Sequence, residues 1–425
     1  MDFFMDWLKL NNLHPTTRTL VLARSLRSLG QGALVVDMTL YMHALGWSGL
    51  RIGMILTAAG LFGAMMSLGV GIASDRLRRR PFLLVYEFII LICSLAALFT
   101  AQPVILSAAI IIAGFGRGAN GAAGPFSPVE QAWLAEEVAP SRRGTVYSMN
   151  TAYGFFGMGL GALLAMLPEF LSYWSGFAHT ALTVTPGAYR PVFIVVAAAS
   201  LVNLWLIFQA NENYYHRLRQ RAVPVTDEDT RVRKEENKML AGLVFLNSFN
   251  GLAVGFTGPL ISYWFAIKFG VGPASIAPMM ALTFFITGIS SLLTGKLSLK
   301  TGIVKIVVRA RFMGLLLLIL LPFVPFFWLA SLVYLLRSAL NRGSVGARQA
   351  LTVGLVRDQR RGLATSLNAL SMQLPQSLGP TFAGFLFSTG QLMVPFILGA
   401  VCQGVYLLLY GKFFRKHNDP GDNEN

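Results

Sequence analysis

Residues 117–150 read RGANGAAGPFSPVEQAWLAEEVAPSRRGTVYSMN, and the closing part of this stretch decides the fold because the chain repeats it. The basic turn Arg142-Arg143-Gly144 is followed by Ser148-x-Asn150. The same elements recur as Arg360-Arg361-Gly362 and Ser366-x-Asn368, at a constant offset of 360 − 142 = 368 − 150 = 218 residues. A chain that repeats its pattern at about half its length is predicted to consist of two similar halves.

The composition indicates a membrane protein. The 425 residues are 54% hydrophobic and 13% charged, with a mean hydropathy of +0.58, whereas a soluble domain carries about 25% charged residues. The formal net charge of +16 would suggest nucleic-acid binding in a soluble chain. Here the basic residues lie between apolar runs, where they act as topology signals. We therefore expect a lipid bilayer as the surroundings and no nucleic-acid partner.

The apolar runs predict about twelve membrane-spanning helices, because a bilayer core of roughly 30 Å requires about 20 apolar residues per helix. The predicted spans are 19–42, 52–72, 82–100, 104–126, 146–167, 191–211, 240–267, 275–295, 306–328, 329–351, 363–388 and 391–413. The fold class is therefore an all-α membrane protein with two pseudo-symmetric six-helix bundles. We assign the N-terminal bundle to residues 1–212, a polar cytoplasmic linker to 213–239 and the C-terminal bundle to 240–425.

Basic residues gather on one side of the predicted helices. They follow the second, fourth, sixth, eighth and tenth spans and the C-terminal tail, while the opposite connections carry few. This asymmetry predicts that both termini are cytoplasmic. We expect a monomeric, multi-pass protein of the plasma (inner) membrane. No removable signal peptide is expected, because the N-terminus lacks a basic region followed by a short apolar core and a cleavage site.

The connection after the second span, residues 71–81, reads GIASDRLRRRP. It has a glycine, then an aspartate four residues later, then clustered arginines, and it resembles the signature loop of the major facilitator superfamily. It departs from that pattern at Arg78, where a second glycine is usual. The stretch Arg117-x-x-Asn120-Gly121-x-x-Gly124 resembles the helix-four motif of the same superfamily. The resemblance covers essentially the whole chain and implies a central cavity that opens alternately to either side.

The signature loop predicts a cytoplasmic gate. Gly71 would let helices approach closely, and Asp75 would cap a helix N-terminus of the other half. We expect the following arginines to pair with Glu130, with Glu136 or Glu137 as substitutes. At the 218-residue offset Glu130 falls on Arg348 (348 − 130 = 218), so the two halves carry opposite charges there. The predicted gate residues are Gly71, Asp75, Arg76, Arg79, Arg80, Glu130 and Arg143.

Polar side chains inside the spans predict the transport pathway. An arginine at mid-bilayer costs about 2.5–3.5 kcal/mol on insertion scales, so it should face a wet cavity or a partner. In the tenth span Arg337, Asn341, Ser344 and Arg348 share one helix face, whereas Arg342 lies on another face and has no assigned role. Glycine stripes in the fifth and seventh spans are expected to be helix-packing faces. The predicted pathway residues are Arg27, Asp37, Tyr41, Arg117, Asn120, Asn150, Asn247, Asn250, Arg337, Asn341, Arg348 and Asn368.

Several kinds of chemistry have no support in the sequence. It contains no nucleotide-binding glycine loop with lysine and Ser/Thr, so coupling to ATP hydrolysis is not expected. The five histidines show no metal-ligand spacing, and no catalytic Ser/His/Asp or Cys/His arrangement lies inside the membrane. We therefore expect no enzyme activity, no cofactor and no metal site.

Two transport functions are compatible with these residues. The leading hypothesis is a proton-coupled exporter of a small organic solute, resembling the drug/proton antiporters. Asp37 would be the proton carrier, and Arg117 would bias the protonation of Asp37 or of a substrate. The fifth span lacks the Gly-Pro pair usual in those antiporters. The alternative is an organic-anion transporter for a carboxylate or phosphate ester, because arginines outnumber acids inside the membrane. A transport-inactive sensor on the same fold is a third alternative.

Overall fold

The computed structural model describes residues 13–117, 127–139, 142–174, 184–212, 227–301, 303–345, 348 and 361–413, and the regular structure in these ranges is helical. The first half contains α2 (Pro15–Ala44), α3 (Gly49–Arg76), α4 (Arg79–Phe99), α5 (Pro103–Ala113), α6 (Ser127–Glu137), α7 (Arg143–Leu164), α8 (Leu167–Trp174), η4 (Pro186–Tyr189) and α9 (Arg190–Gln209). The second half contains α11 (Asp227–Thr257), α12 (Ile261–Phe269), α13 (Pro273–Thr301), α14 (Ile303–Leu320), η5 (Leu321–Phe323), α15 (Phe327–Gly343), α17 (Arg361–Ser388) and α18 (Val394–Phe413).

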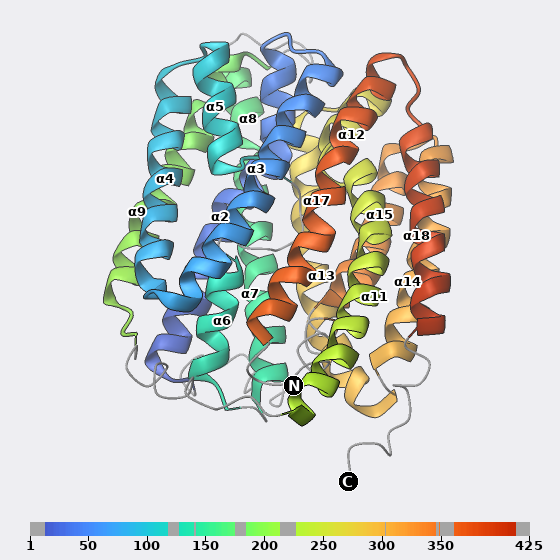
Figure 1. The fold of residues 1–425 in the computed structure, drawn as a ribbon. Helices are drawn as coiled ribbons and strands as arrows, with labels where there is room; N and C mark the ends of the chain where they lie inside the picture. Colours follow the sequence, from blue (N-terminus) through green and yellow to red (C-terminus); the bar gives the residue numbers. More distant parts are fainter. Residues whose placement is uncertain are drawn as a thin grey trace, which may run out of the picture.

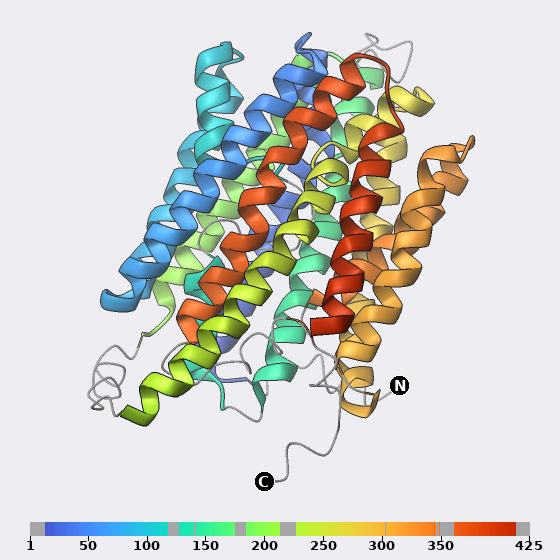
Figure 2. The ribbon, with the colours of Figure 1, turned by 45° about the vertical axis from the view of Figure 1, so that its right-hand side comes forward.

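The helices form two bundles that lie side by side. The blue-to-green helices of the first half occupy one side of Figure 1, and the yellow-to-red helices of the second half occupy the other. In Figure 2, α3, α17 and α11 run next to one another across the boundary between the bundles. The protein is an all-helical membrane protein with two six-helix bundles, as the repeat predicted.

The helix boundaries differ from the predictions at four places. The predicted span 240–267 is divided between two helices, since α11 ends at Thr257 and α12 begins at Ile261. The predicted span 104–126 is not one helix, because α5 ends at Ala113 and Gly114 and Gly116 follow it with positive φ angles of 71° and 70°. Such angles end an α-helix and suit glycine. The predicted linker 213–239 is partly helical, since α11 already begins at Asp227. The break between the ninth and tenth helices lies at residues 321–326 instead of near Trp328.

The outer surface of the bundles suits a lipid environment. Eight of the described helices are long and apolar enough to cross a membrane. Large apolar side chains point outward from several of them, including Phe99 (78% exposed) and Phe208 (67% exposed). In water such a surface would be unfavourable, whereas hydrocarbon chains cover it without cost. The central helices α2 and α17 are long enough as well but carry more polar residues.

Glycines bring the central helices into backbone contact. A Cβ added to Gly161 of α7 would overlap the carbonyl oxygen of Leu29 in α2, and one added to Gly379 of α17 would overlap the backbone of Gly255 in α11. Close approach of this kind maximises van der Waals contact between helices that gain little from the hydrophobic effect in lipid. The glycine stripes are therefore packing faces, which confirms the prediction for the fifth and seventh spans.

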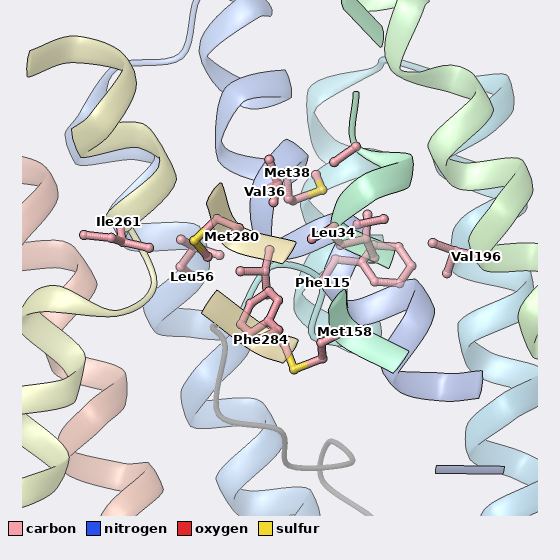
Figure 3. Packing of buried hydrophobic residues seen from close by; sticks show 14 of the residues in the cluster. Leu34, Val36, Met38, Leu56, Phe115, Met158, Val196, Ile261, Met280 and Phe284 are labelled. Atoms are coloured by element: carbon pink, nitrogen blue, oxygen red, sulfur yellow. The ribbon is translucent and has the colours of Figure 1, made fainter. Parts of the chain in front are cut away.

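The two halves are joined at the end of the molecule where α2 connects to α3. Apolar side chains from both halves interdigitate there, among them Val36 and Met158 from the first and Met280 and Phe284 from the second (Figure 3). Polar contacts add to this packing. The Ser262 hydroxyl donates to the Val35 carbonyl at 3.1 Å, and the Thr381 hydroxyl donates to that of Thr57 at 2.7 Å.

A carboxylate reinforces the same closed end. Glu169 of α8 accepts a hydrogen bond of 2.6 Å from the backbone N–H of Ala274, in the first turn of α13. An anion is favourable at this position because the helix dipole and the unpaired N–H groups both attract negative charge. The first half thus caps a helix of the second half.

The glycine contacts lead to a stability prediction. Gly161→Ala should lower the apparent melting temperature of the detergent-purified protein, because the added methyl group forces α2 and α7 apart. Gly69 is the matched control, since it lies within α3 and no atom lies within 4 Å of an added Cβ. Gly69→Ala should leave the melting temperature unchanged or raise it slightly. Equal effects of the two substitutions would show that the α2–α7 contact is not tight.

Candidate functional site

A cavity of about 260 Å³ lies between the two halves. Its lining begins near mid-bundle at Val35, Pro259 and Pro380 and extends to Arg24 and Tyr410, toward the end where α2 begins and α18 ends. The opposite end is sealed by the contacts described above. The volume is near the lower end of the range of about 300–1,000 Å³ for drug-sized ligands, so the cavity suits a small solute.

The lining of this cavity is strongly basic. Among its described residues there are seven arginines and no aspartate or glutamate. The arginines are Arg24, Arg27, Arg117, Arg311, Arg337, Arg342 and Arg348. Side-chain amides supply most of the remaining polar surface, and they are Gln31, Gln131, Asn247, Asn250, Asn341, Asn368, Gln373, Gln376 and Gln403.

The first half neutralises its arginines with two buried glutamates. Arg27 donates from Nε to Glu87 Oε1 at 2.5 Å and from Nη1 to Glu130 Oε2 at 2.7 Å. Arg24 donates from Nη1 to Glu130 Oε1 at 3.3 Å. All four side chains are 5% exposed or less. Two positive and two negative charges therefore balance within one network behind the cavity wall.

Two asparagines complete this network. Asn203 of α9 donates to Glu87 Oε1 at 2.7 Å, and Asn150 of α7 donates to Glu130 Oε1 at 3.4 Å. The network therefore links α2, α4, α6, α7 and α9 through hydrogen bonds to two carboxylates. Buried ions persist in proteins when both a counter-charge and hydrogen bonds are present, and here both are.

The prediction that Glu130 pairs with the signature-loop arginines is wrong for the described residues. The break after α5 places Glu130 on the separate helix α6, which turns its carboxylate toward Arg24 and Arg27. Arg79 pairs instead with Glu136 at 2.8 Å, which was the predicted substitute.

Two of the predicted gate residues, Arg79 and Arg80, are bound by Glu212, which was not among the predicted gate residues. The backbone N–H groups of Arg79 and Arg80 donate to the two carboxylate oxygens of Glu212 at 2.8 and 3.1 Å, so Glu212 caps the start of α4. Arg80 also donates to the Phe208 carbonyl. Gly71 is buried within α3. The side chains of the other three gate residues lie outside the described residues, and they are Asp75, Arg76 and Arg143.

Two buried arginines of the second half, Arg311 and Arg337, contact only neutral groups among the described residues. Arg311 donates from Nη1 to Asn250 Oδ1 at 2.5 Å and lies over the Tyr406 ring at 4.8 Å. Arg337 donates from Nη2 to the Thr257 hydroxyl at 3.2 Å. These two arginines are 4% and 7% exposed, and the Nε atom of each has no hydrogen-bond partner within the described part of the chain.

Within the described part of the chain, Arg311 and Arg337 contact no acid. From residue 240 to residue 413 the only acid is Asp358, which lies outside the described residues. The buried ion pairs of Arg24 and Arg27 with Glu87 and Glu130 belong to the first half. An isolated buried charge is costly, so the guanidinium groups of the second half require water or an anion from the cavity.

Most of the predicted pathway residues come together in this cavity. Those that line it are Arg27, Arg117, Asn247, Asn250, Arg337, Asn341, Arg348 and Asn368. Asn150 lies behind the wall in the glutamate network, and Asn120 lies outside the described residues. Asp37 and Tyr41 are buried but do not belong to the lining.

Other lining residues were missed by sequence reasoning. Arg311 was not selected, although it is a charged residue within the predicted span 306–328, which is itself a signal. Arg24 and Gln403 also contribute, the latter by donating to the Arg311 carbonyl at 3.1 Å. Arg342 had no assigned role and now lines the cavity, where it donates to the Tyr334 hydroxyl at 3.1 Å.

Arg117 enters the cavity from the break after α5. It donates to the Ala59 carbonyl of α3 at 3.2 Å. Gly63 and Gly114 border its guanidinium, and a Cβ at either position would overlap it. Because both positions are glycine, there is space for the Arg117 guanidinium.

A two-bundle membrane fold around a polar cavity that is sealed at one end defines a transporter of small solutes rather than an enzyme. The sequence matches the Major Facilitator Superfamily over residues 20–340 and 243–425, and the chain belongs to this family. An uncharacterized membrane protein of Saccharomyces cerevisiae is 21% identical over 401 residues, which cover 88% of each chain.

Solved structures share the fold at low sequence identity. A bacterial homolog of the human lysosomal transporter Spinster, in an inward-facing and unoccupied conformation, matches 96% of this chain and 98% of its own length with a TM-score of 0.67 and 14% identity. The human organic anion transporter TETRAN matches 93% of this chain and 99% of its own length with a TM-score of 0.60 and 15% identity. Identities this low establish a common fold only.

The buried network leads to a second stability prediction. Glu130→Gln removes one of two negative charges that hold Arg24 and Arg27, and breaking a buried ion pair typically costs about 3–5 kcal/mol. The apparent melting temperature should therefore fall markedly. Glu136→Gln is the control, because Glu136 is 41% exposed and its pair with Arg79 is worth only about 0–1 kcal/mol. An unchanged melting temperature for Glu130→Gln would show that the network is not structural.

Proposed function

We propose that this transporter carries small organic anions by alternating access of the central cavity. The observation that carries the proposal is the cavity lining, with seven arginines and no described acid. Guanidinium groups bind carboxylates and phosphates through paired, charge-assisted hydrogen bonds, and they hold their charge at any physiological pH. Arg311 and Arg337 both line the cavity, and the Nε atom of each has no hydrogen-bond partner among the described residues.

The amides of the lining support a polar organic solute rather than a bare inorganic ion. Asn and Gln side chains both donate and accept, so they match hydroxyl or amide groups on a solute. Two of the amides already contact each other, since Asn247 donates to Asn368 at 2.7 Å. The name of the TETRAN structure gives the same substrate class for that protein, but the likeness is one of fold, and the arginines carry the argument here.

The orientation of the cavity supports a cytoplasmic opening in this state. Its lining extends toward the end where α2 begins and α18 ends, and the basic connections of the sequence lie at the same end. By the positive-inside rule that end faces the cytoplasm of a plasma (inner) membrane. Arg79, Glu136 and Glu212 would then form part of the cytoplasmic gate.

Proton-coupled export is a second candidate function, and one observation favours it. Asp37 of α2 is 2% exposed, and neither carboxylate oxygen has a hydrogen-bond partner among the described residues. A charged carboxylate is costly in such a place, and a bound proton would remove the charge. Asp37 lies in the same helix as Arg24 and Arg27, so a change there can reach the cavity wall through α2.

The anion proposal is tested by binding. Succinate and glycerol phosphate should raise the melting temperature of the purified protein more than inorganic phosphate does, whereas choline and tetraethylammonium should not raise it. Arg337→Gln and Arg311→Gln should each weaken anion binding roughly 10- to 150-fold, since a hydrogen bond to a charged group is worth about 1.5–3 kcal/mol.

Arg51→Gln is the matched control, because Arg51 lies at the start of α3 against Trp47 and outside the cavity lining. It should bind anions as the unmodified protein does. Stabilisation by the cations alone would contradict the anion proposal, and so would equal losses in all three arginine variants.

The proton hypothesis is tested separately in proteoliposomes. Asp37→Asn keeps the shape of the side chain but cannot bind and release a proton, so solute flux driven by a pH gradient should disappear. Exchange of solute at equal pH on both sides should persist and serves as the control for folding. If pH-driven flux is undiminished in the variant, Asp37 is not the proton carrier.

A further inference from the structure

The two halves of the cavity wall differ in how their charge is balanced. In the first half, Arg24 and Arg27 are matched by Glu87 and Glu130 within hydrogen-bond distance. In the second half, Arg311 and Arg337 are as deeply buried, but they contact an amide, a hydroxyl and an aromatic ring. Among the described residues, Arg311 and Arg337 therefore present positive charge to the cavity without a carboxylate in contact with it.

This imbalance matters because of the steps in alternating access. To pass from one open state to the other, the cavity must close around whatever it contains. If it closes empty, the charges of Arg311 and Arg337 lose contact with bulk water and have no counter-ion. If it closes around an anion, the solute supplies both the negative charge and the acceptors for the free N–H groups.

We infer that this transporter is an obligatory anion exchanger, in which an anion must occupy the cavity during the crossing in each direction. The inference rests on the proposed anion specificity and adds a coupling mode to it. Inward movement of one anion is then matched by outward movement of another, and the empty carrier does not return.

A proton cannot take the place of the second anion at these arginines. The guanidinium groups are already fully protonated, and a further proton would add positive charge. No described acid lines the cavity, so no group there becomes neutral when the carrier is empty. Asp37 lies away from the lining and cannot offset the charge of Arg311 or Arg337 by direct contact.

The test compares flux into loaded and empty vesicles. Purified protein is reconstituted in proteoliposomes with a potassium ionophore, so that membrane potential does not limit net movement. Uptake of radiolabelled phosphate, succinate and glycerol phosphate is measured into vesicles that contain the same unlabelled anion or a zwitterionic buffer. We expect uptake into loaded vesicles to be faster by at least about tenfold. Equal rates would overturn the exchange mechanism.

One substitution should convert the exchanger into a carrier that also returns empty. Asn250 Oδ1 accepts the hydrogen bond from Arg311 at 2.5 Å, so Asn250→Asp places a fixed carboxylate at the same position. The built-in counter-charge should raise uptake into empty vesicles toward the exchange rate while anion affinity falls. Asn250→Ser is the paired variant, because it loses the amide without adding charge. Whatever its exchange rate, its uptake into empty vesicles should stay at least about tenfold below its uptake into loaded vesicles.

A second variant guards against a failure to fold. Gln403 is 3% exposed and donates to the Arg311 carbonyl, so Gln403→Glu adds a carboxylate beside the same arginine. If neither folded acidic variant gains uptake into empty vesicles, the charge argument is overturned. Anion binding combined with equal flux into empty vesicles would refute exchange and leave the anion function intact. Absence of both anion binding and anion flux would refute the proposed function itself.

Discussion

The neutralisation of buried arginine charge is the constraint on which the rest of this structure depends. In the first half the charge is balanced internally by Glu87 and Glu130, and the hydrogen bonds of that network tie α2 to its neighbours. In the second half the arginines are held in position by neutral groups, which fix their geometry without cancelling their charge. One half can therefore act as a rigid frame, while the other depends on what enters the cavity.

The helix packing makes this arrangement possible. Glycines allow α2 to touch α7 and α11 to touch α17 at the level of the backbone, so the polar faces of these helices are brought to a common centre. At the closed end the halves meet through apolar packing and a few polar contacts, in which Glu169 caps α13 and Ser262 donates to the Val35 carbonyl. The polar contacts can be exchanged for others when the halves move relative to one another.

The cavity residues were predictable where a polar side chain interrupts an apolar run. Arg337, Asn341 and Arg348 share one face of a helix, and a polar stripe of that kind is not expected to face lipid. Arg311 escaped prediction, because it has no polar neighbours at helical spacing. Glu130 was assigned to the wrong partner, because residues 104–126 were predicted to form one span. In the structure α5 ends at Ala113, and Glu130 lies on the separate helix α6, which begins at Ser127.

By itself, the sequence determined the membrane environment, the two-fold repeat and the helical class, because these follow from periodicity and composition along the chain. The family resemblance came from two short motifs, residues 71–81 and 117–124. It also determined that residues 240–413 contain a single acid, Asp358. Only the tertiary structure decided which charges are paired, since ion pairs such as Arg27 with Glu87 join helices that are distant in sequence. The balance of charge in the cavity depends on which helix faces pack against one another, and no local sequence pattern specifies this packing.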